Sequence, residues 1–346
     1  MIYIRADANE KIGTGHVMRC LSIANEIRKI GKEVQFIYAD RRTEKIIQQH
    51  GFWGICLDSA WNDLNQEISK MQRIIQQKKI DFLLVDSYFV TIPYFNAIKK
   101  YVSIGYLDDL HLFSYPVDLL MNYNFYAKKY NYKGIYQRAG YSTLFLLGSL
   151  YVPLREEFQN VVREIKEKPD KILITSGGTD AYNILGNLLY ELKKQHWFYQ
   201  FEYYVVAGRF HKQMEELKME CESNQNIHLL VNIPNISDYM RECDLAVTAG
   251  GVTIYELCAS GIPSIVYTMA DNQLEIAQTV SEDGIIPWAG DIRNDKKDCI
   301  KNIIEQIKLL SKDVNVRKKR SAAMQKLVDG KGAQRFAFYL AEKFLV

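Results

Sequence analysis

The segment "DLAVTAGGVTIYELCASGIPSIVYT", residues 244–268, decides the fold. It begins with a short apolar run, continues through a glycine pair into a stretch of helical length, and ends in a second apolar run, "PSIVYT". Apolar runs of this length, separated by an amphipathic stretch, are typical of two buried parallel strands joined by a helix. The segment therefore predicts one βαβ unit.

The same alternation extends along the whole chain. In the first half, strands are predicted at 2–7, 33–40, 81–87, 102–109, 117–123 and 143–148. In the second half they are predicted at 171–178, 201–208, 227–232, 244–251, 263–268 and 284–290. The pattern pauses at "YVPLREEFQNVVREIKEKPDK", which carries two prolines and a charged helix. The sequence thus predicts an α/β protein made of two doubly wound, Rossmann-like domains.

The expected domain boundaries follow from that pause. Residues 1–150 form the N-terminal domain, 151–169 the hinge, and 170–330 the C-terminal domain. Residues 331–346 form a last helix with enough apolar residues to pack back on a domain. The length of 346 residues agrees with two domains, which we expect to face each other across a cleft.

Composition excludes several classes of protein. With 44 Lys and Arg against 41 Asp and Glu, the net charge of +3 is too small for a protein that binds nucleic acid by neutralising phosphates. No apolar run approaches the ~20 residues of a membrane span, so a cytoplasmic location without stable membrane association is expected. The six cysteines lack zinc-ligand spacing and are expected to be buried.

Polar and glycine-rich residues follow the predicted strands. They comprise Asp7, Asp86 to Tyr88, Asp108, Asp109, "SGGTD" and "TAGG". Because ligands bind at the carboxyl ends of parallel strands, we expect these residues to line the cleft. Adjacent residues of a strand point to opposite faces, so Asp108 is favoured as the cleft residue and Asp109 as a cap or surface residue.

Two glycine pairs precede predicted helices and are candidate phosphate loops. Glycine permits close approach of a ligand, and free N–H groups at a helix start favour anions. The candidates are Gly177, Gly178 and Thr179 in the first loop and Gly250, Gly251, Val252 and Thr253 in the second. Neither loop matches the dinucleotide or Walker fingerprint, which argues against a nicotinamide cofactor and against ATP hydrolysis.

Two neighbouring features extend this predicted nucleotide site. Glu256 follows the second loop by one helical turn, where it either accepts ribose hydroxyls or lies on a solvated helix face. Asp271, Asn272 and Gln273 stand together at a strand end, and N-capping explains only one of them.

The stretch "EKIGTGHVMRC" near the N-terminus places Gly13 and Gly15 before His16. It has three interpretations, namely a phosphate loop, a catalytic site or a tight turn followed by a polar residue. The other five histidines have surface-like contexts and receive no role; they are His50, His111, His196, His211 and His228.

Together, "SGGTD", "TAGGVTIYELCASGIPSIVY" and "ADNQLEIA" resemble the nucleotide-sugar domain of GT-B enzymes related to the MurG glycosyltransferase. The resemblance implies a GT-B-like fold, in which the glycine loop and Glu256 hold UDP. It also implies that UDP is the ligand of the two candidate phosphate loops. The N-terminal stretch with Gly13 and Gly15 is then expected to face the sugar.

A second resemblance covers Met1 to about Phe336. It rests on "RADANEKIGTGHVMRCLSIA", "LVDSY", "LDDL", "LLMNYNFYA", "PLREEF" and "LVDGKGAQRF". These motifs are similar to those of the PseG-type hydrolases of UDP-2,4-diacetamido-2,4,6-trideoxy-β-L-altropyranose in pseudaminic acid biosynthesis, whose homologues include spore-coat polysaccharide proteins. The resemblance implies that His16 is the catalytic histidine, that Tyr88 lies in the substrate site and that Asn272 lies near the sugar. Ser87 departs from the pattern, because the family often has a bulkier polar residue there.

The implied reaction is attack of water at the anomeric carbon, giving UDP and free sugar. His16 would activate the water, Gly13 and Gly15 would leave room for the sugar, and helix-start N–H groups would stabilise the leaving diphosphate. Arg155 is a candidate sugar contact or a hinge ion-pair partner, and Gln273 is grouped with the substrate contacts. No cofactor is expected, and no metal, because no D-x-D element is present.

Two other functions stay open at this stage. The first is a glycosyltransferase that passes the sugar to a carbohydrate or lipid acceptor, and the second is a non-catalytic nucleotide-sugar binding protein. The oligomeric state stays open as well.

Overall fold

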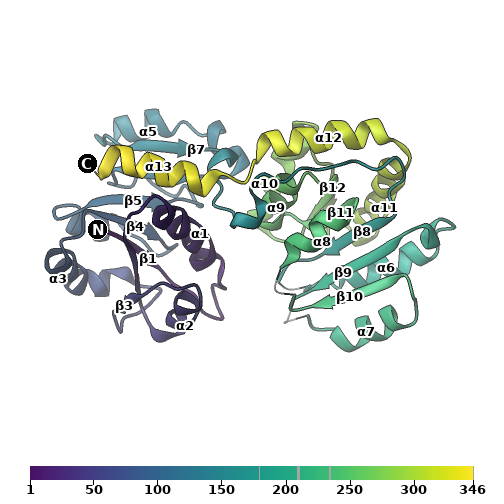
Figure 1. Cartoon of the computed structure of the whole chain (residues 1–346), viewed down its shortest axis with the longest axis horizontal. Helices are drawn as coiled ribbons and strands as arrows, with labels where there is room; N and C mark the ends of the chain where they lie inside the picture. The colour runs from purple at the N-terminus through teal and green to yellow at the C-terminus, as the bar shows by residue number, and fades with distance from the viewer. Residues whose placement is uncertain (179, 209–210, 234, 346) are drawn as a thin grey trace. The chain divides into compact units, whose positions relative to one another are not determined.

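A computed structural model describes residues 1–178, 180–208, 211–233 and 235–345. The chain forms two compact units (Figure 1). Unit 1 contains Met1–Glu156 and Gly330–Val346, and unit 2 contains Glu157–Asp329. Within the described ranges, no helix combines the length and apolar composition that crossing a bilayer requires.

Unit 1 is built on a seven-stranded parallel sheet with the order β3-β2-β1-β4-β5-β6-β7. Its strands are β1 (Ile2–Ala6), β2 (Val34–Tyr38), β3 (Gly54–Cys56), β4 (Phe82–Asp86), β5 (Ser103–Leu107), β6 (Leu119–Asn122) and β7 (Leu144–Leu147). Every predicted strand of this half is present. The additional strand β3 has three residues at the sheet edge, all only partly buried, and is too short to produce an apolar run.

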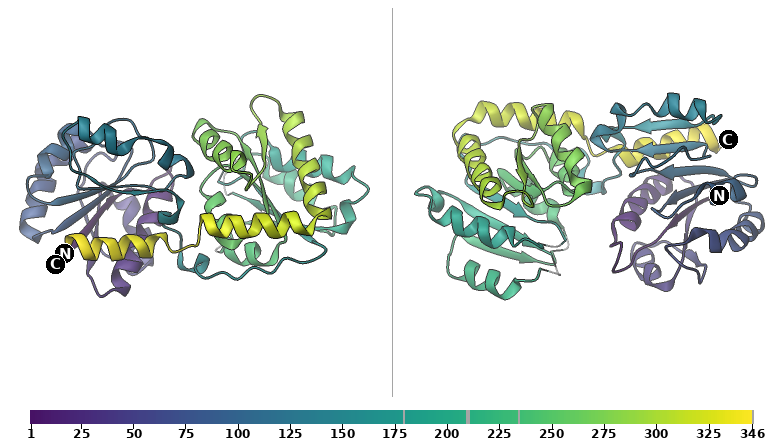
Figure 2. Two further views of the ribbon diagram at one scale, coloured as in Figure 1. Left: turned by 90° about the horizontal axis from the view of Figure 1, so that it is seen from above. Right: turned by 180° about the vertical axis from the view of Figure 1, so that it is seen from behind.

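Helices cover both faces of this sheet (Figure 2). They are α1 (Gly15–Lys29), α2 (Arg41–Gln49), α3 (Ile68–Lys78), α4 (Ile92–Ile98), α5 (Tyr132–Arg138) and α13 (Gly332–Phe344), with 3₁₀ turns η1 (Leu64–Glu67), η2 (Phe125–Lys129) and η3 (Ser149–Tyr151). A further 3₁₀ turn, η4 (Glu156–Phe158), contains the boundary between the two units in the chain. Leu83 of β4 belongs to the cluster that includes α3, α4 and α5. Its neighbour Phe82 contacts Phe344 of α13, which packs against α1, so these two helices lie on the opposite face.

The last helix is fixed to unit 1 at its first turn. A Cβ on Gly332 would lie 2.1 Å from the backbone oxygen of Val152, so only glycine fits there. Arg335 donates to the carbonyl oxygen of Leu150 at 2.8 Å. The helix therefore returns to the unit that contains the N-terminus.

Unit 2 has a six-stranded parallel sheet with the order β10-β9-β8-β11-β12-β13. Its strands are β8 (Lys171–Thr175), β9 (Glu202–Ala207), β10 (Ile227–Val231), β11 (Leu245–Ala249), β12 (Ser264–Thr268) and β13 (Trp288–Asp291). Its helices are α6 (Ile184–Lys193), α7 (Met214–Glu222), α8 (Ile236–Glu242), α9 (Thr253–Ser260), α10 (Asp271–Glu282), α11 (Lys296–Lys312) and α12 (Val314–Leu327), with η5 (Phe198–Gln200). The main core of the unit joins the sheet to α6, α7 and α11, while α8 and α12 pack against α9.

Both sheets confirm the predicted doubly wound α/β fold. In each, the strand order reverses once, between β1 and β4 in unit 1 and between β8 and β11 in unit 2. Such a reversal separates the loops that follow the two strands and leaves a crevice at their carboxyl ends, where ligands bind in open α/β sheets. The loops after these four strands are therefore the places to look for a site.

Candidate active site

The loop after β1 closes on itself before α1 begins. The backbones of Asn9 and Gly13 form a bridge, with Gly13 N–H donating to the Asn9 carbonyl at 2.8 Å. The side chain of Asn9 accepts from the N–H groups of Lys11 and Ile12. Gly13 has a φ of +71°, a conformation that favours glycine. This closed loop delivers Gly15 and His16 as the first two residues of α1.

Gly15 has ordinary helical geometry, and a Cβ added to it would meet nothing within 4 Å. Neither backbone conformation nor packing in unit 1 therefore requires glycine at this position. The predicted role of Gly15, to leave room for a substrate, stays a prediction.

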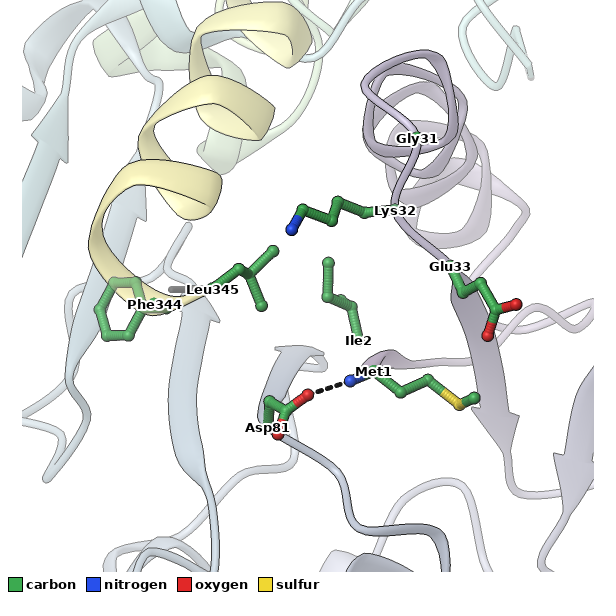
Figure 3. A pocket seen from close by; sticks show the side chains of 8 residues that line it. All are labelled: Met1, Ile2, Gly31, Lys32, Glu33, Asp81, Phe344 and Leu345. Atoms are coloured by element: carbon green, nitrogen blue, oxygen red, sulfur yellow. Dashed lines mark hydrogen bonds and ion pairs between the residues drawn. The ribbon is translucent and has the colours of Figure 1, made fainter.

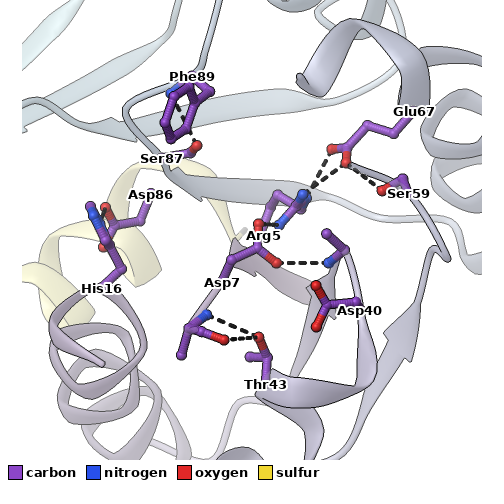
Figure 4. Close-up of polar contacts among 12 residues, drawn as sticks. Arg5, Asp7, His16, Asp40, Thr43, Ser59, Glu67, Asp86, Ser87 and Phe89 are labelled. Atoms are coloured by element: carbon purple, nitrogen blue, oxygen red, sulfur yellow. Dashed lines mark hydrogen bonds and ion pairs between the residues drawn. The ribbon is translucent and has the colours of Figure 1, made fainter. Parts of the chain in front are cut away.

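His16 is 6 % exposed and contacts the end of β4, the strand on the other side of the reversal point. Its Nδ1 lies 2.6 Å from Oδ1 of Asp86, whose side chain is fully buried (Figure 4). The edge of the Tyr88 ring packs on the imidazole, with centroids 4.5 Å apart and an interplanar angle of 76°. The predicted site residues His16 and Tyr88 are thus in direct contact.

Arg19, one helical turn after His16, joins two carboxylates. Its Nε donates to Oδ2 of Asp86 at 2.6 Å, and one terminal nitrogen donates to Oδ2 of Asp109 at 2.6 Å. The same terminal nitrogen also contacts the hydroxyl of Tyr123. Tyr88 donates to Asp109 at 3.3 Å. We call His16, Arg19, Asp86, Tyr88, Asp109 and Tyr123 the histidine cluster.

The histidine cluster keeps its buried carboxylate, Asp86, ionised. Burial alone would raise the pKa of the Asp86 carboxyl, but the guanidinium of Arg19 and the imidazole of His16 outweigh burial and hold that pKa far below its usual range. Burial, with Asp109 nearby, raises the pKa of Tyr88. Asp86 is therefore an anion and Tyr88 a neutral hydrogen-bond donor at any physiological pH.

A second polar network anchors the end of β1 (Figure 4). The fully buried Arg5 donates twice to Glu67 at 2.8 Å and once to Asp7 at 2.6 Å. The other oxygen of Asp7 accepts from the N–H of Ala39, and Tyr94 donates to Glu67. Asp7 is therefore used to join β1 to the end of β2, beside the loop that carries His16.

Asp108 and Asp109 have different surroundings. Asp108 is 0 % exposed and accepts from the N–H groups of Leu110 and His111 and from the hydroxyl of Tyr132. Its carboxylate shapes the turn after β5, whereas Asp109 reaches the histidine cluster. Ser87 is also internal, since its hydroxyl accepts from the N–H of Phe89. Arg155 is partly exposed and follows η3.

In unit 2, the loop after β8 contains the first predicted phosphate loop. Gly177 has a φ of +80° and donates its N–H to the hydroxyl of Thr175. A Cβ on Gly178 would meet nothing within 4 Å, and its N–H has no acceptor among the described residues. A Cβ on Gly208, after β9, would lie 2.2 Å from the carbonyl oxygen of Gly178, so the two loops touch. Thr179 lies outside the described residues.

Close to this loop, one expectation is wrong. His211 is buried, not on the surface, and its Nε2 lies 3.3 Å from Asp180. Asp180 also accepts from the N–H groups of Ile184 and Leu185, so it closes the start of α6.

The loop after β11 carries the second predicted phosphate loop. The N–H groups of Gly250 and Gly251 are already used, because they donate to Tyr267 and Ala249. The N–H groups of Val252 and Thr253, at the start of α9, have no acceptor within the described part of the chain. They are the donors that an anion could reach at this loop.

Packing explains one of the two glycines in this loop. A Cβ on Gly250 would be crowded by Gln273, at 3.2 Å, whereas a Cβ on Gly251 would meet nothing within 4 Å. Gln273 accepts from the N–H of Met269, which holds the start of α10 beside the loop. Glu256 is partly exposed in the first turns of α9, and Asn272 is exposed in the first turn of α10.

A separate cavity of about 370 Å³ lies in unit 1 (Figure 3). It is lined by Met1, Ile2, Gly31, Lys32, Glu33, Asp81, Phe344 and Leu345, with an ion pair between the Met1 amino group and Asp81. Phe344 and Leu345 are at the end of α13, and the other six residues start or precede β1, β2 and β4, at the amino ends of the strands. The cavity is therefore at the opposite end of the sheet from His16.

Sequence reasoning missed Arg19, Asp86, Asp109 and Tyr123 as members of one cluster. The spacing of His16 and Arg19, three residues apart in a helix, puts both on one face and could have linked them. Asp86 is 70 residues from His16, and only the adjacency of β1 and β4 brings the two together.

One family model matches the second half of the chain. Residues 171–336 match the glycosyltransferase family 28 C-terminal domain. MurG of Acinetobacter baumannii has a similar fold, with a TM-score of 0.73 over 99% of both chains and 13% identity.

Relatives are found along most of the chain. An uncharacterized protein of Methanocaldococcus jannaschii is 29% identical over 79% of this chain. The aligned part spans 57% of that protein's length. UDP-2,4-diacetamido-2,4,6-trideoxy-beta-L-altropyranose hydrolase of Campylobacter jejuni is 23% identical, with 74% of this chain and 86% of that protein aligned. The spore coat polysaccharide biosynthesis protein SpsG of Bacillus subtilis is 22% identical over 99% of this chain and 98% of its own.

The resemblances predicted from the motifs are thus confirmed. The chain has the two-sheet α/β fold of MurG and other GT-B glycosyltransferases, and it is similar to proteins named as PseG-type UDP-sugar hydrolases and spore coat polysaccharide proteins.

Proposed function

We propose that this protein is a cytoplasmic hydrolase of a UDP-linked 2,4-diacetamido-2,4,6-trideoxy hexose in a pathway of the pseudaminic acid type. The observation that carries the proposal is the contact of His16 with a buried carboxylate, at the point where the strand order of unit 1 reverses. The hydrolase named among the relatives supplies the substrate class.

His16 acts as the general base. Asp86 occupies Nδ1, so Nε2 is the ring nitrogen left to accept a proton from water. As that proton moves to Nε2, the water oxygen bonds to the anomeric carbon. The bond between that carbon and the diphosphate oxygen breaks, its electron pair stays on the oxygen, and the products are UDP and the free sugar.

The leaving diphosphate is stabilised by unit 2. The N–H groups of Gly178, Val252 and Thr253, for which the described residues offer no acceptor, are donors at two loops that flank the reversal point of the second sheet. Gly177, Gly250 and Gly251 shape these loops, and Glu256 accepts the ribose hydroxyls. No cofactor and no metal takes part in this mechanism.

The proposed sugar contacts of unit 1 are the residues around His16, and those of unit 2 are at the start of α10. Tyr88 and the open space at Gly15 lie beside the imidazole, and Asp109 replaces Asp108 as the carboxylate that faces the sugar. Arg155, Asn272 and Gln273 complete the proposed set of substrate contacts.

A glycosyltransferase is the second candidate. The family 28 domain in residues 171–336 and the MurG-like fold favour it. In that reaction His16 would deprotonate an acceptor hydroxyl instead of water.

Incubation with a panel of UDP-linked amino sugars, without any acceptor, distinguishes the hydrolase from the glycosyltransferase. The hydrolase should release UDP and free sugar, and in ¹⁸O-water the label should enter the sugar. Label in UDP would show attack on phosphorus. Release that appears only when a sugar acceptor is added would establish the transferase.

A further inference from the structure

The Asp86 carboxylate is surrounded by donors on both oxygens. Oδ1 lies 2.6 Å from Nδ1 of His16, and Oδ2 lies 2.6 Å from Nε of Arg19. The thiol of Cys20 approaches Oδ2 at 3.4 Å. The side chain is 0 % exposed, so no water competes for these contacts.

The position of the proton between His16 and Asp86 follows from charge. The nearby guanidinium keeps Asp86 ionised, and an ionised carboxylate can only accept. The proton therefore resides on Nδ1. A terminal nitrogen of Arg19 also lies 3.1 Å from Nδ1, but it is a donor, and the shorter bond to the anionic carboxylate sets the tautomer.

Arg19 fixes Asp86 in turn. It reaches Asp86 through two nitrogens and Asp109 through the third, which only the planar fork of a guanidinium allows. Arg19 is 12 % exposed, so little solvent weakens these pairs. The two carboxylates it joins come from the ends of neighbouring strands, β4 and β5.

We propose that Asp86 is a positioning residue for His16, holding the Nδ1–H tautomer so that Nε2 faces the reacting water, and that Arg19 keeps Asp86 in place. This proposal rests on the proposed role of His16 as the base. Its alternative is a purely structural ion-pair network, whose loss would change stability without changing the tautomer.

The tautomer is measured directly by NMR of protein carrying ¹⁵N-labelled histidine. The His16 resonances are identified by their absence from His16→Gln. In the wild-type protein, at a pH where the ring is neutral, we expect Nδ1 to be protonated and Nε2 to be bare. A protonated Nε2 with a bare Nδ1 would overturn the proposal. This measurement needs no substrate, so it fails or succeeds independently of whether UDP-sugars are hydrolysed.

Asp86→Asn tests the consequence for turnover. An amide can donate to Nδ1 and so favour the wrong tautomer, for which a loss of about 10³-fold or more in kcat is expected. KM and UDP affinity should stay within about threefold, because Asp86 is buried away from the ligand. A kcat within tenfold of wild type, or an unchanged His16 tautomer, would contradict the proposal.

Asp118→Asn is the matched control. Asp118 precedes β6, accepts from the N–H of Ile104 and pairs with Lys99, all at the other end of the strands. Its variant should keep wild-type kcat.

Variants of Arg19 test the proposal independently of Asp86→Asn, and they can be used if Asp86→Asn does not fold. Arg19→Lys keeps the charge but loses the fork, so it should retain more kcat than Arg19→Gln, with both showing mixed His16 tautomers. Wild-type kcat in Arg19→Gln would remove Arg19 from the proposal.

Discussion

Asp108 and Asp109 are neighbours in the chain, but their carboxylates belong to different networks. Asp108 is fully buried and holds the turn after β5 together with Tyr132. Asp109 accepts from Arg19 and Tyr88 in the histidine cluster. The first carboxylate supports the fold, and the second lies where a substrate could be contacted.

Mutation of Asp108 should therefore mainly lower stability, and mutation of Asp109 should mainly lower activity. Asp108→Ala leaves two backbone donors and a buried hydroxyl unpaired, so we expect a loss of about 1–3 kcal/mol in the free energy of unfolding. Asp109→Asn keeps an oxygen that can accept from Arg19, so it should cost less unfolding free energy than Asp108→Ala, but it should lower kcat/KM about tenfold or more. Urea unfolding and steady-state kinetics on both variants measure this. Equal kinetic losses with equal destabilisation would refute the division.

His16→Gln should separate chemistry from nucleotide binding. Because the base is lost, kcat should fall by about 10²–10⁴-fold, while the Kd of UDP measured by calorimetry stays unchanged. The nucleotide contacts are proposed on unit 2, and His16 lies on unit 1. Loss of UDP binding in this variant would place His16 in the phosphate site.

Alanine variants of Gly15 and Gly251 test the proposed sugar and diphosphate sites, because the fold requires glycine at neither position. A Cβ at Gly15 or at Gly251 meets no protein atom within 4 Å, so Gly15→Ala and Gly251→Ala should both fold with wild-type melting temperatures. Gly251→Ala should weaken UDP binding because the methyl group occupies space proposed for the diphosphate. Gly15→Ala should leave UDP binding intact and raise KM for the UDP-sugar. The reverse pattern would exchange the two proposed roles.

Glu67→Gln should destabilise unit 1 strongly. The variant leaves the fully buried Arg5 with one anionic partner, Asp7, instead of two. Breaking a buried ion pair from one side costs about 3–5 kcal/mol. Chemical denaturation measures this cost, and Glu342→Gln on the exposed side of α13 is the control expected to be neutral, because its ion pair with Lys343 is open to solvent. A cost below 1 kcal/mol would show that Asp7 alone satisfies Arg5.

Acid should weaken the protein through Asp86. The pKa of the Asp86 carboxyl is lower in the folded state than in the unfolded chain, where it is about 4. The stabilisation by Asp86 is therefore complete above pH 4 and is lost as the pH falls from there toward the pKa of the folded state. The difference in unfolding free energy between wild type and Asp86→Asn should be present at pH 5 and shrink as the pH falls below 4. A difference that grows on acidification would mean that Asp86 is protonated in the native state.

The fold could be predicted because its signal is local. Buried parallel strands give continuous apolar runs, such as "FLLVD" in β4, and each predicted strand was found. Strand β3 was missed because three half-buried residues at an edge produce no such run.

The site could be predicted only in part, because its contacts are long-range. His16 and Tyr88 were identified by resemblance, and the structure adds that they touch. The sequence predicted that Asp108 faces the cleft because adjacent residues of a strand point to opposite faces. Strand β5 ends at Leu107, so this rule applies to neither Asp108 nor Asp109. His211 is buried although charged residues surround it in sequence, because Asp180 accepts its ring N–H.

The return of α13 to the first unit has a consequence for engineering. Residues 157–329 form one uninterrupted stretch of chain, whereas the unit that carries His16 is assembled from both ends of the sequence. We therefore expect the stretch to be exchangeable as a cassette, with both splice points at unit boundaries, and the exchange would replace all the proposed nucleotide contacts at once. Cutting the chain at residue 329 would instead strip α13 from α1 and expose the side of the sheet where Phe344 covers Phe82.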